Sequence, residues 1–305
     1  MINIAFSFDY NFYRQAIIAI TSLLDFAKNK INYNIYCLIK SDIKSQEQEE
    51  IFDIIKQKSP ESRVFFISMD EYFNNVFETK RITSSAYSRL KLHFLLGNLN
   101  RIIYSDVDVI FNTDLSELSQ IDLTNYFFAG VKEIFLNTEE SIKYHNNIFP
   151  DRKYYLKKIA KNYRNSGFLI LNLDKLRQGN FDKQIDKLSL NNYPYQDQDV
   201  LNIIFQNKMN KVYTLSPSYI VMPQGIPRGY QLAVIENIIS FKDYYDVINT
   251  PKIIHWANNK PWDNPYIPQG YIWWIYVYKN KSYFDYFYDN AKIKPDINLI
   301  RSLCK

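Results

Sequence analysis

Short apolar runs alternate with helix-like patterns along most of the 305-residue chain, and this alternation constrains the fold more than any other feature. The predicted strands are Ile2–Phe6, Asn34–Ile39, Val64–Ile67, Arg101–Ser105, Phe127–Val131, Gly167–Leu173 and Lys252–His255. The predicted helices are Tyr13–Phe26, Ser45–Lys58, Ser84–Leu96 and Asp197–Gln206. Strands that alternate with helices indicate an α/β fold built on a parallel or mixed sheet. A cluster of Pro and Gly between residues 216 and 230 predicts a long loop.

Three residue types are scarce, and their scarcity excludes several kinds of site. The seven glycines form neither G-x-G-x-x-G nor G-x-x-x-x-G-K-[ST], which excludes the dinucleotide fingerprint and the P-loop. Two cysteines, Cys37 and Cys304, are too few for a disulfide framework or a four-cysteine zinc site. The histidines at 93, 145 and 255 lie too far apart for a multi-histidine zinc motif. We expect His93, in a predicted helix, and His145, in a polar loop, to have structural or solvent-facing roles.

The charge and the N-terminal segment indicate where the protein acts. The net charge of +5 is spread along the chain and is too small to predict nucleic-acid binding. The N-terminus has no basic region and reaches Asp9 too early for a signal peptide. The longest mainly apolar run, Ala16–Leu24, is about half of the roughly 20 residues that a membrane span needs. We therefore expect a cytoplasmic protein.

Asp106 and Asp108 directly follow a predicted strand, Arg101–Ser105. Ligands of α/β proteins bind at the carboxyl ends of the strands, and two carboxylates at i and i+2 can point the same way there. Mg²⁺ and Mn²⁺ are usually held by a few carboxylates together with substrate phosphates. However, about one Asp-x-Asp is expected by chance in such a chain, and Asp197-x-Asp199 is a second. The pair alone therefore leaves a metal site and a solvated turn as alternatives.

Three further groups carry candidate chemistry, each with a plain structural alternative. His255 closes a predicted strand and could complete a metal site, or could simply hydrogen-bond at the strand end. Asp197 begins a predicted helix, where acidic residues also stabilise the helix dipole. Asp9 and Phe12 follow the first strand; they could bind and stack on a nucleotide base, or cap the first helix and pack in the core.

Six short motifs follow one another along the chain. They are Ser7-Phe-Asp9-Tyr-Asn11-Phe12, Ser85-Ala-Tyr87-Ser-Arg89-Leu, Tyr104-Ser-Asp106-Val-Asp108, Arg164-Asn165-Ser166-Gly167, Tyr195-Gln-Asp197-Gln198-Asp199 and His255-x4-Lys260-Pro261-Trp262. Together they resemble the retaining glycosyltransferases of family 8, which include bacterial lipopolysaccharide galactosyl- and glucosyltransferases and glycogenin. The resemblance runs from about residue 2 to residue 262. It implies a GT-A fold, a single Rossmann-like domain with a mixed central sheet.

The resemblance also implies roles for individual residues. The implied contacts of a UDP-sugar donor are Ser7, Asp9, Asn11, Phe12, Arg89, Val107, Asn165, Ser166, Gly167 and Lys260. The implied ligands of Mn²⁺, or of Mg²⁺, are Asp106, Asp108 and His255. Asp197 and Gln198 would face the anomeric carbon as catalytic residues, and Glu133 would lie on the acceptor side. The family's last motif is H-x-x-G-x-x-K-P-W; here that stretch is one residue shorter, and Asn258 stands near the family's glycine.

The implied activity is transfer of glucose or galactose from UDP-glucose or UDP-galactose to a glycan or lipid-linked glycan, such as lipopolysaccharide. A double displacement needs a carboxylate nucleophile near the anomeric carbon, but the family offers the amide of Gln198. We therefore expect a front-face substitution, in which the acceptor hydroxyl attacks beside the departing phosphate. Two alternatives stay open: a nucleotidyltransferase that uses the Asp-x-Asp pair, and an inactive module that binds sugar nucleotides.

The last forty residues lie outside the resemblance. We predict a catalytic domain over residues 1–265 and a helical, aromatic and basic extension over residues 266–305. Its lysines are interleaved with Trp273, Trp274 and many tyrosines. Such a segment could rest peripherally on the inner face of a membrane that carries a lipid-linked acceptor. The alternative is a set of helices packed on the catalytic domain.

Overall fold

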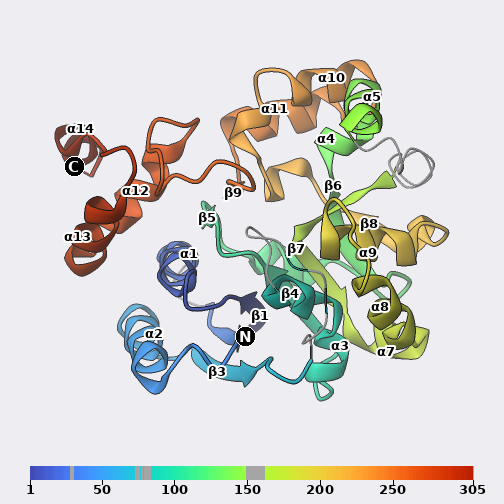
Figure 1. Cartoon of the computed structure of the whole chain (residues 1–305), viewed down its shortest axis with the longest axis horizontal. Helices are drawn as coiled ribbons and strands as arrows, with labels where there is room; N and C mark the ends of the chain where they lie inside the picture. The colour runs from blue at the N-terminus through green and yellow to red at the C-terminus, as the bar shows by residue number, and fades with distance from the viewer. Residues whose placement is uncertain (28–30, 73–75, 77, 79–83, 149–161, 305) are drawn as a thin grey trace.

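The computed structural model describes residues 1–27, 31–72, 76, 78, 84–148 and 162–304. In this part of the chain the centre is a seven-stranded sheet with the strand order β3-β2-β1-β4-β7-β6-β8 (Figure 1). Its strands are β1 (Ile2–Ser7), β2 (Tyr33–Ile39), β3 (Arg63–Ser68), β4 (Arg101–Ser105), β6 (Phe128–Lys132), β7 (Arg164–Asn172) and β8 (Val212–Thr214). The first four are parallel neighbours, β7 is antiparallel to both β4 and β6, and β8 is parallel to β6. The sheet is mixed, which is one of the two kinds that the alternation of runs allows and the kind that the resemblance implies.

Side chains of successive strand residues point to opposite faces, and each face carries its own core. On β1, Ile4 and Phe6 join the core under one layer of helices, while Ala5 joins the core under the other. The first layer contains α1 (Tyr13–Phe26) and α2 (Ser45–Lys58), and the second contains α3 (Leu92–Leu95), α7 (Leu173–Gly179), α8 (Asp182–Ser189) and α9 (Gln196–Phe205). Helices therefore cover both faces of the sheet, and the ends of its strands are where a ligand can bind.

The helix expected over Ser84–Leu96 is not continuous. The chain instead forms a 3₁₀ segment, η1 (Ser84–Leu90), followed by the short α3. The Oγ of Ser88 donates to the carbonyl of Ser85 at 2.7 Å, and the Nε of Arg89 donates to the carbonyl of Ala86 at 2.8 Å. Side chains that bond to local carbonyls compete with α-helical hydrogen bonds. The apolar spacing predicted helical structure here but did not predict that it is interrupted.

Other differences concern the ends and connections of elements. The start of α2 is capped by Glu47, whose Oε2 accepts from the backbone N–H of Lys44 at 2.9 Å. The expected loop at 216–230 contains two 3₁₀ turns, η6 (Pro217–Tyr219) and η7 (Pro223–Gly225), and the start of a helix. The sequence pattern did not predict α7, α8, β8, β5 (Val109–Phe111), α4 (Ile134–Asn137), α5 (Glu139–Ile148), α10 (Gly229–Ile235) or α11 (Phe241–Asn249).

The C-terminal segment is helical, with α12 (Gly270–Tyr278), α13 (Lys281–Asn290) and α14 (Ile297–Leu303). Trp273 and Trp274 are fully buried in the same core as α1, and the indole N–H of Trp274 donates to the carbonyl of Pro261 at 2.8 Å. Packing against α1 and the core beneath it therefore accounts for these tryptophans. Lys305 lies outside the described residues, and the boundary at residue 265 stays a prediction. No helix in the described ranges combines the length and apolarity that a membrane crossing requires.

Candidate active site

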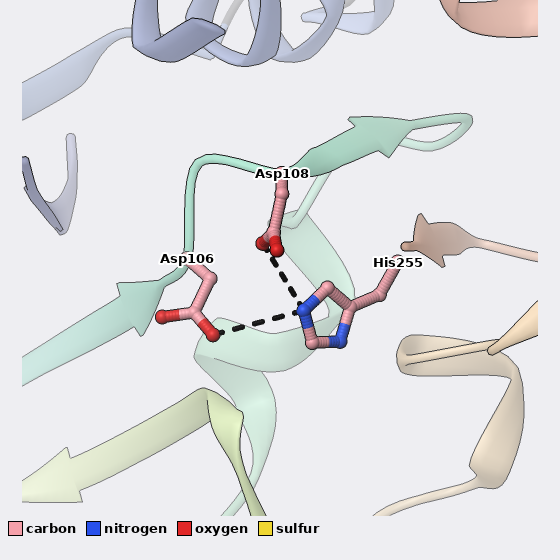
Figure 2. A group of neighbouring side chains, drawn as sticks. All are labelled: Asp106, Asp108 and His255. Carbon is pink, nitrogen blue, oxygen red and sulfur yellow. Dashed lines mark ion pairs between the residues drawn. The ribbon is translucent and has the colours of Figure 1, made fainter. Parts of the chain in front are cut away.

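Two short strands bring Asp106, Asp108 and His255 together. Asp106 follows β4 and Asp108 precedes β5, which pairs antiparallel with β9 (Ile253–His255) so that Val109 lies opposite His255. The Nε2 of His255 is 3.1 Å from Asp108 Oδ1 and 3.7 Å from Asp106 Oδ2 (Figure 2). One ligand atom from each of the three residues lies within 4.8 Å of the others. Two carboxylate oxygens and an imidazole nitrogen are suitable donors for Mn²⁺ or Mg²⁺.

Lys260 adds a positive charge to this group. Its Nζ forms an ion pair with Asp108 and donates to the carbonyl of Trp256 at 2.7 Å. Burial alone raises the pKa of Asp108, but Lys260 and His255 outweigh it and hold this pKa well below its usual range. Burial alone lowers the pKa of His255, but the charge of Asp108 raises it above the ordinary value. The shorter stretch before Lys260 therefore still brings its amine to the Asp-x-Asp pair.

Gly167 explains how the three side chains can approach one another. A Cβ at this position would lie 2.8 Å from Asp106 Oδ2 and 3.0 Å from the Cε1 of His255. Real Cβ atoms do not come this close to a carboxylate oxygen, so only glycine leaves the carboxylate in place. The carbonyl of Gly167 also accepts from the backbone N–H of Asp106 at 2.8 Å. The donor set thus suits a divalent cation, and the absence of a side chain at Gly167 leaves the Asp106 carboxylate in place within it.

Arg89 connects the Asp-x-Asp pair to the start of α9. Its guanidinium donates from Nη2 to Asp106 Oδ1 at 2.7 Å and lies 3.1 Å, through Nε, from Asp197 Oδ2. Nη1 donates to the carbonyl of Ser166 at 2.7 Å. The guanidinium also lies over the ring of Tyr104, whose hydroxyl donates to Asp106 at 3.1 Å. A buried arginine shared by two carboxylates fixes their relative positions.

The side chains of Asp197 and Gln198 are both held by Ser166. Gln198 Oε1 accepts from the backbone N–H of Ser166 at 2.8 Å, and Asp197 Oδ2 accepts from the Ser166 hydroxyl at 3.1 Å. Burial raises the pKa of Asp197 to about 6, with Arg89 opposing the shift and Asp106 adding to it. The structure therefore brings together the two residues that the sequence assigns to the anomeric carbon, beside the carboxylates assigned to the metal.

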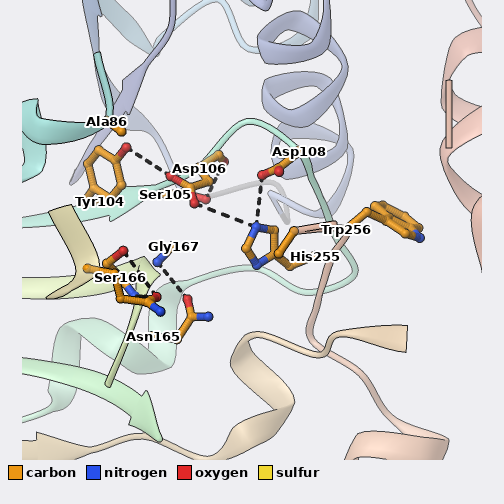
Figure 3. Close-up of polar contacts among 12 residues, drawn as sticks. Ala86, Tyr104, Ser105, Asp106, Asp108, Asn165, Ser166, Gly167, His255 and Trp256 are labelled. Carbon is orange, nitrogen blue, oxygen red and sulfur yellow. Dashed lines mark hydrogen bonds and ion pairs between the residues drawn. The ribbon is translucent and has the colours of Figure 1, made fainter. Parts of the chain in front are cut away.

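Asn165 forms hydrogen bonds with Glu133 and with Gly167. Its Nδ2 donates to Glu133 Oε2 at 2.6 Å. Its Oδ1 accepts from the backbone N–H of Gly167 at 2.7 Å (Figure 3). Both Asn165 and Glu133 are almost completely buried. The side-chain amide of Asn165 thus connects Glu133, which we expect on the acceptor side, to Gly167 beside the candidate metal ligands.

The residues expected to bind the nucleotide lie at the neighbouring strand end. β1 is parallel to β4, with Phe6 opposite Ser105, so Asp9 and Asp106 follow strands that end at the same edge. The Oδ1 of Asp9 accepts from the backbone N–H of Asn11 at 3.0 Å, and the half-buried Phe12 packs edge-on against Trp262. Two further residues of the expected donor site, Ser7 and Val107, are buried, and Ser7 Oγ donates to the carbonyl of Ser85 at 2.7 Å.

Sequence reasoning gave no role to Tyr104, although it lies two residues before Asp106 on the same side of β4. We expected His145 to lie in a polar loop, and this was wrong. The residue lies in α5, is buried, and bonds to the hydroxyl of Tyr195. Its Nδ1 lies 2.7 Å from the carbonyl of Ser141, so Nδ1 carries the proton and Nε2 accepts from Tyr195. The contact spans fifty residues of sequence, and no local pattern could have predicted it. His93 has the expected structural role, 3.3 Å from Asp182.

Comparison with known proteins places these observations in a family. The sequence pattern of Glycosyl transferase family 8 matches residues 3–265. A Haemophilus influenzae protein named "Putative glycosyltransferase" is 31% identical over 228 residues, which are 71% of this chain and 64% of that protein. The Escherichia coli K12 lipopolysaccharide 1,2-glucosyltransferase is 22% identical over 309 residues, 97% of this chain and 80% of that protein. This chain thus spans just under two thirds of the Haemophilus relative.

A solved structure shares the fold. The galactosyltransferase LgtC, determined in complex with donor and acceptor sugar analogs, matches with a TM-score of 0.68 at 20% identity, and the match covers 97% of this chain and 98% of that one. This likeness shows the fold, and the GT-A type of α/β architecture is the one that the motifs imply.

Proposed function

The chain belongs to glycosyl transferase family 8, and on that premise we propose that it is a metal-dependent, retaining hexosyltransferase. Its donor would be UDP-glucose or UDP-galactose, and its acceptor a surface glycan such as lipopolysaccharide. The observation that carries this proposal is the convergence of Asp106, Asp108 and His255 beside Lys260, at the strand edge where β1 and β4 end. A nucleotidyltransferase is set aside by the family, whereas an inactive binding module stays an alternative for the experiments below.

The metal group and Lys260 would act on the leaving diphosphate. A divalent cation, when bound there, would neutralise the negative charge that develops on UDP as the glycosidic bond breaks. In the structure Lys260 serves as the counter-ion of Asp108. A cation on Asp108 would replace this partner, and the Lys260 ammonium could then turn to a phosphate oxygen. Positive groups aimed at developing charge are often the largest contribution to catalysis.

The contacts of Asp197 and Gln198 support a front-face reaction. The Asp197 carboxylate is shared by Arg89 and Ser166, and the Gln198 oxygen already accepts a backbone N–H. The Gln198 oxygen belongs to an uncharged amide, which is a weak nucleophile, and Asp197 Oδ2 is the ion-pair partner of Arg89. In the proposed step the acceptor oxygen bonds to the anomeric carbon as the bond to the β-phosphate oxygen breaks, and its proton passes to that phosphate. Asp197 and Gln198 would orient and stabilise the sugar cation.

The acceptor side of the proposal depends on Glu133 and on the relatives. Glu133 accepts from Asn165 Nδ2, and we place it on the acceptor side because the resemblance implies that position. One relative is a lipopolysaccharide glucosyltransferase by name, which supports a lipid-linked glycan as the acceptor class.

Calorimetry of UDP binding tests the donor site. We expect UDP to bind in the presence of Mn²⁺ and at least about tenfold more weakly without it, because metal and Lys260 together meet the diphosphate. Asp108→Ala should abolish the metal-dependent part. Asp53→Ala, an exposed acid on α2, is the matched control and should bind as the unaltered protein does. Equal binding with and without metal would refute the metal assignment.

Trapping experiments test the mechanism. Incubation with a UDP-2-fluorosugar should leave the protein mass unchanged, because no protein oxygen forms a covalent glycosyl bond in a front-face reaction. A glycosylated peptide carrying Asp197 or Glu133 would instead establish a double displacement.

A further inference from the structure

Two cations lie side by side behind the acceptor side of the site. Lys132 ends β6, Arg164 begins β7, and the two are direct partners across the strands. Partners across a strand pair point to the same face, whereas successive residues point to opposite faces. Lys132 and Arg164 therefore face away from their neighbours Glu133 and Asn165. Arg164 is only 3% exposed and Lys132 is half-buried.

Their hydrogen-bond partners are all neutral. Arg164 donates from Nη1 to the carbonyl of Asn162 at 3.1 Å and from Nη2 to the Thr214 hydroxyl at 2.9 Å, while its buried Nε has no hydrogen-bond partner. Lys132 donates to the carbonyl of Ile238 at 3.1 Å. Among the described residues, no carboxylate forms an ion pair with either cation. Buried arginines are normally paired, and like charges opposite each other on two strands destabilise a sheet.

The pKa values of both side chains are lowered, which reflects the electrostatic cost of this arrangement. Burial lowers the pKa of Arg164 to about 10. Burial also lowers the pKa of Lys132, the charge of Arg164 lowers it further, and Asp243 opposes this. Asp243 does not pair with Lys132, because its carboxylate caps α11 through the backbone and hydroxyl of Ser240 at 3.0 and 2.7 Å. A bound anion would offset the repulsion between the two cations.

We propose that Lys132 and Arg164 form an oxyanion site that takes a phosphate group. Planar guanidinium groups bind phosphate oxygens in pairs, and an adjacent ammonium adds a point charge. Both Thr214 and Asn162, which bond to Arg164, are exposed, so the guanidinium lies just beneath the surface, and an ion would meet the half-buried Lys132 first. The phosphate is either a free ion or a substituent of a phosphorylated acceptor that is long enough to extend from Glu133 round the ends of β6 and β7 to this face; this second source rests on the proposed function.

Thermal unfolding of the metal-free protein tests the site. Inorganic phosphate should raise the unfolding midpoint by about 2 °C or more over chloride at equal ionic strength, because a ligand that binds only the folded state stabilises it. Lys132→Gln and Arg164→Gln should lose this response. Lys132→Gln is the milder change, because that side chain is only half-buried. If Arg164→Gln does not fold, the phosphate response of Lys132→Gln tests the site.

Two controls separate this site from others. Lys183→Gln removes an exposed cation on α8 and should keep the phosphate response. Lys260→Gln should keep it too, because the proposed donor site is elsewhere. The same midpoint shift in Lys132→Gln as in the unaltered protein, or its loss in Lys260→Gln, would overturn the proposal.

The source of the phosphate is decided by comparing ligands. A larger shift with galactose 6-phosphate than with inorganic phosphate indicates a phosphorylated acceptor, and equal shifts indicate the free ion. UDP binding is measured by calorimetry on the same preparation. Absence of a phosphate response with intact UDP binding overturns the oxyanion site alone, whereas absence of UDP binding overturns the proposed function alone.

Discussion

Gly167 is the residue that the proposed metal group depends on for space. Its α-carbon faces Asp106, Asn165 and His255, and a methyl group there would lie 2.8 to 3.0 Å from atoms of all three. The residue belongs to one of the six motifs, yet motif membership alone does not say why glycine is needed. The structure supplies the reason, because β7 passes directly beneath the carboxylate that follows β4.

Gly167→Ala should therefore displace the Asp106 carboxylate and weaken metal-dependent UDP binding by about tenfold or more. The measurement is calorimetry with UDP and Mn²⁺. Gly97→Ala is the matched control, since a Cβ there meets no atom closer than 3.9 Å, and it should bind UDP normally. Unchanged binding in Gly167→Ala would show that the three side chains do not hold the metal.

Asp197 gives the activity a predicted pH dependence. Its pKa is raised to about 6, chiefly by burial, and the carboxylate must be ionised to pair with Arg89. The kcat/KM for donor hydrolysis should thus fall as the pH drops through about 6. Asp197→Asn should lower the rate and remove this acidic limb; a limb that persists in the variant would assign it to another group.

The same shift has a consequence for stability with the opposite sign. Because the folded-state pKa lies above the unfolded value, the folded protein binds this proton more tightly. The contribution of Asp197 to the free energy of unfolding is therefore fully present below about pH 4 and is lost as the pH rises through about 6. Denaturant titrations of the protein and of Asp197→Asn between pH 4 and 7 measure this difference.

At the scale of elements, strands and long helices could be predicted from apolar spacing, and interruptions could not. The helix α1 has the predicted bounds, Tyr13–Phe26, because its pattern is local. The predicted helix Ser84–Leu96 breaks where Ser88 and Arg89 bond to nearby carbonyls and Arg89 turns toward Asp106. That turn depends on a residue beyond the helix, so no periodicity within the segment reveals it.

The extension offers a test at this scale. Trp274 on α12 is fully buried, packs edge-on against Trp273 and Phe284, and donates to the carbonyl of Pro261. Trp274→Ala should lower the free energy of unfolding by about 3–5 kcal/mol, the usual cost of a large core deletion.

Denaturant titration measures this loss. Tyr266→Ala, at a position 57% exposed, is the control and should cost far less. Equal effects of the two changes would mean that α12 is not part of the core.

At the scale of the whole molecule, the order of strands decides which motifs meet. Alternation of runs predicts a parallel or mixed sheet but does not predict that β7 lies between β4 and β6. That order puts Gly167 beside Asp106 and Asn165 beside Glu133. The pairing of β5 with β9 likewise brings His255 to the Asp-x-Asp pair across about 150 residues of sequence. The resemblance named these residues as a group, and the sheet topology explains why they converge.

The central claim is that this site transfers a hexose from a UDP-sugar. It is tested by incubating the protein with Mn²⁺ and a panel of UDP-sugars and measuring the release of UDP over time. We expect slow hydrolysis of UDP-glucose or UDP-galactose, lost on removal of the metal and in Asp108→Ala. UDP binding without release from any donor would identify an inactive binding module, and the absence of both binding and release would contradict the account.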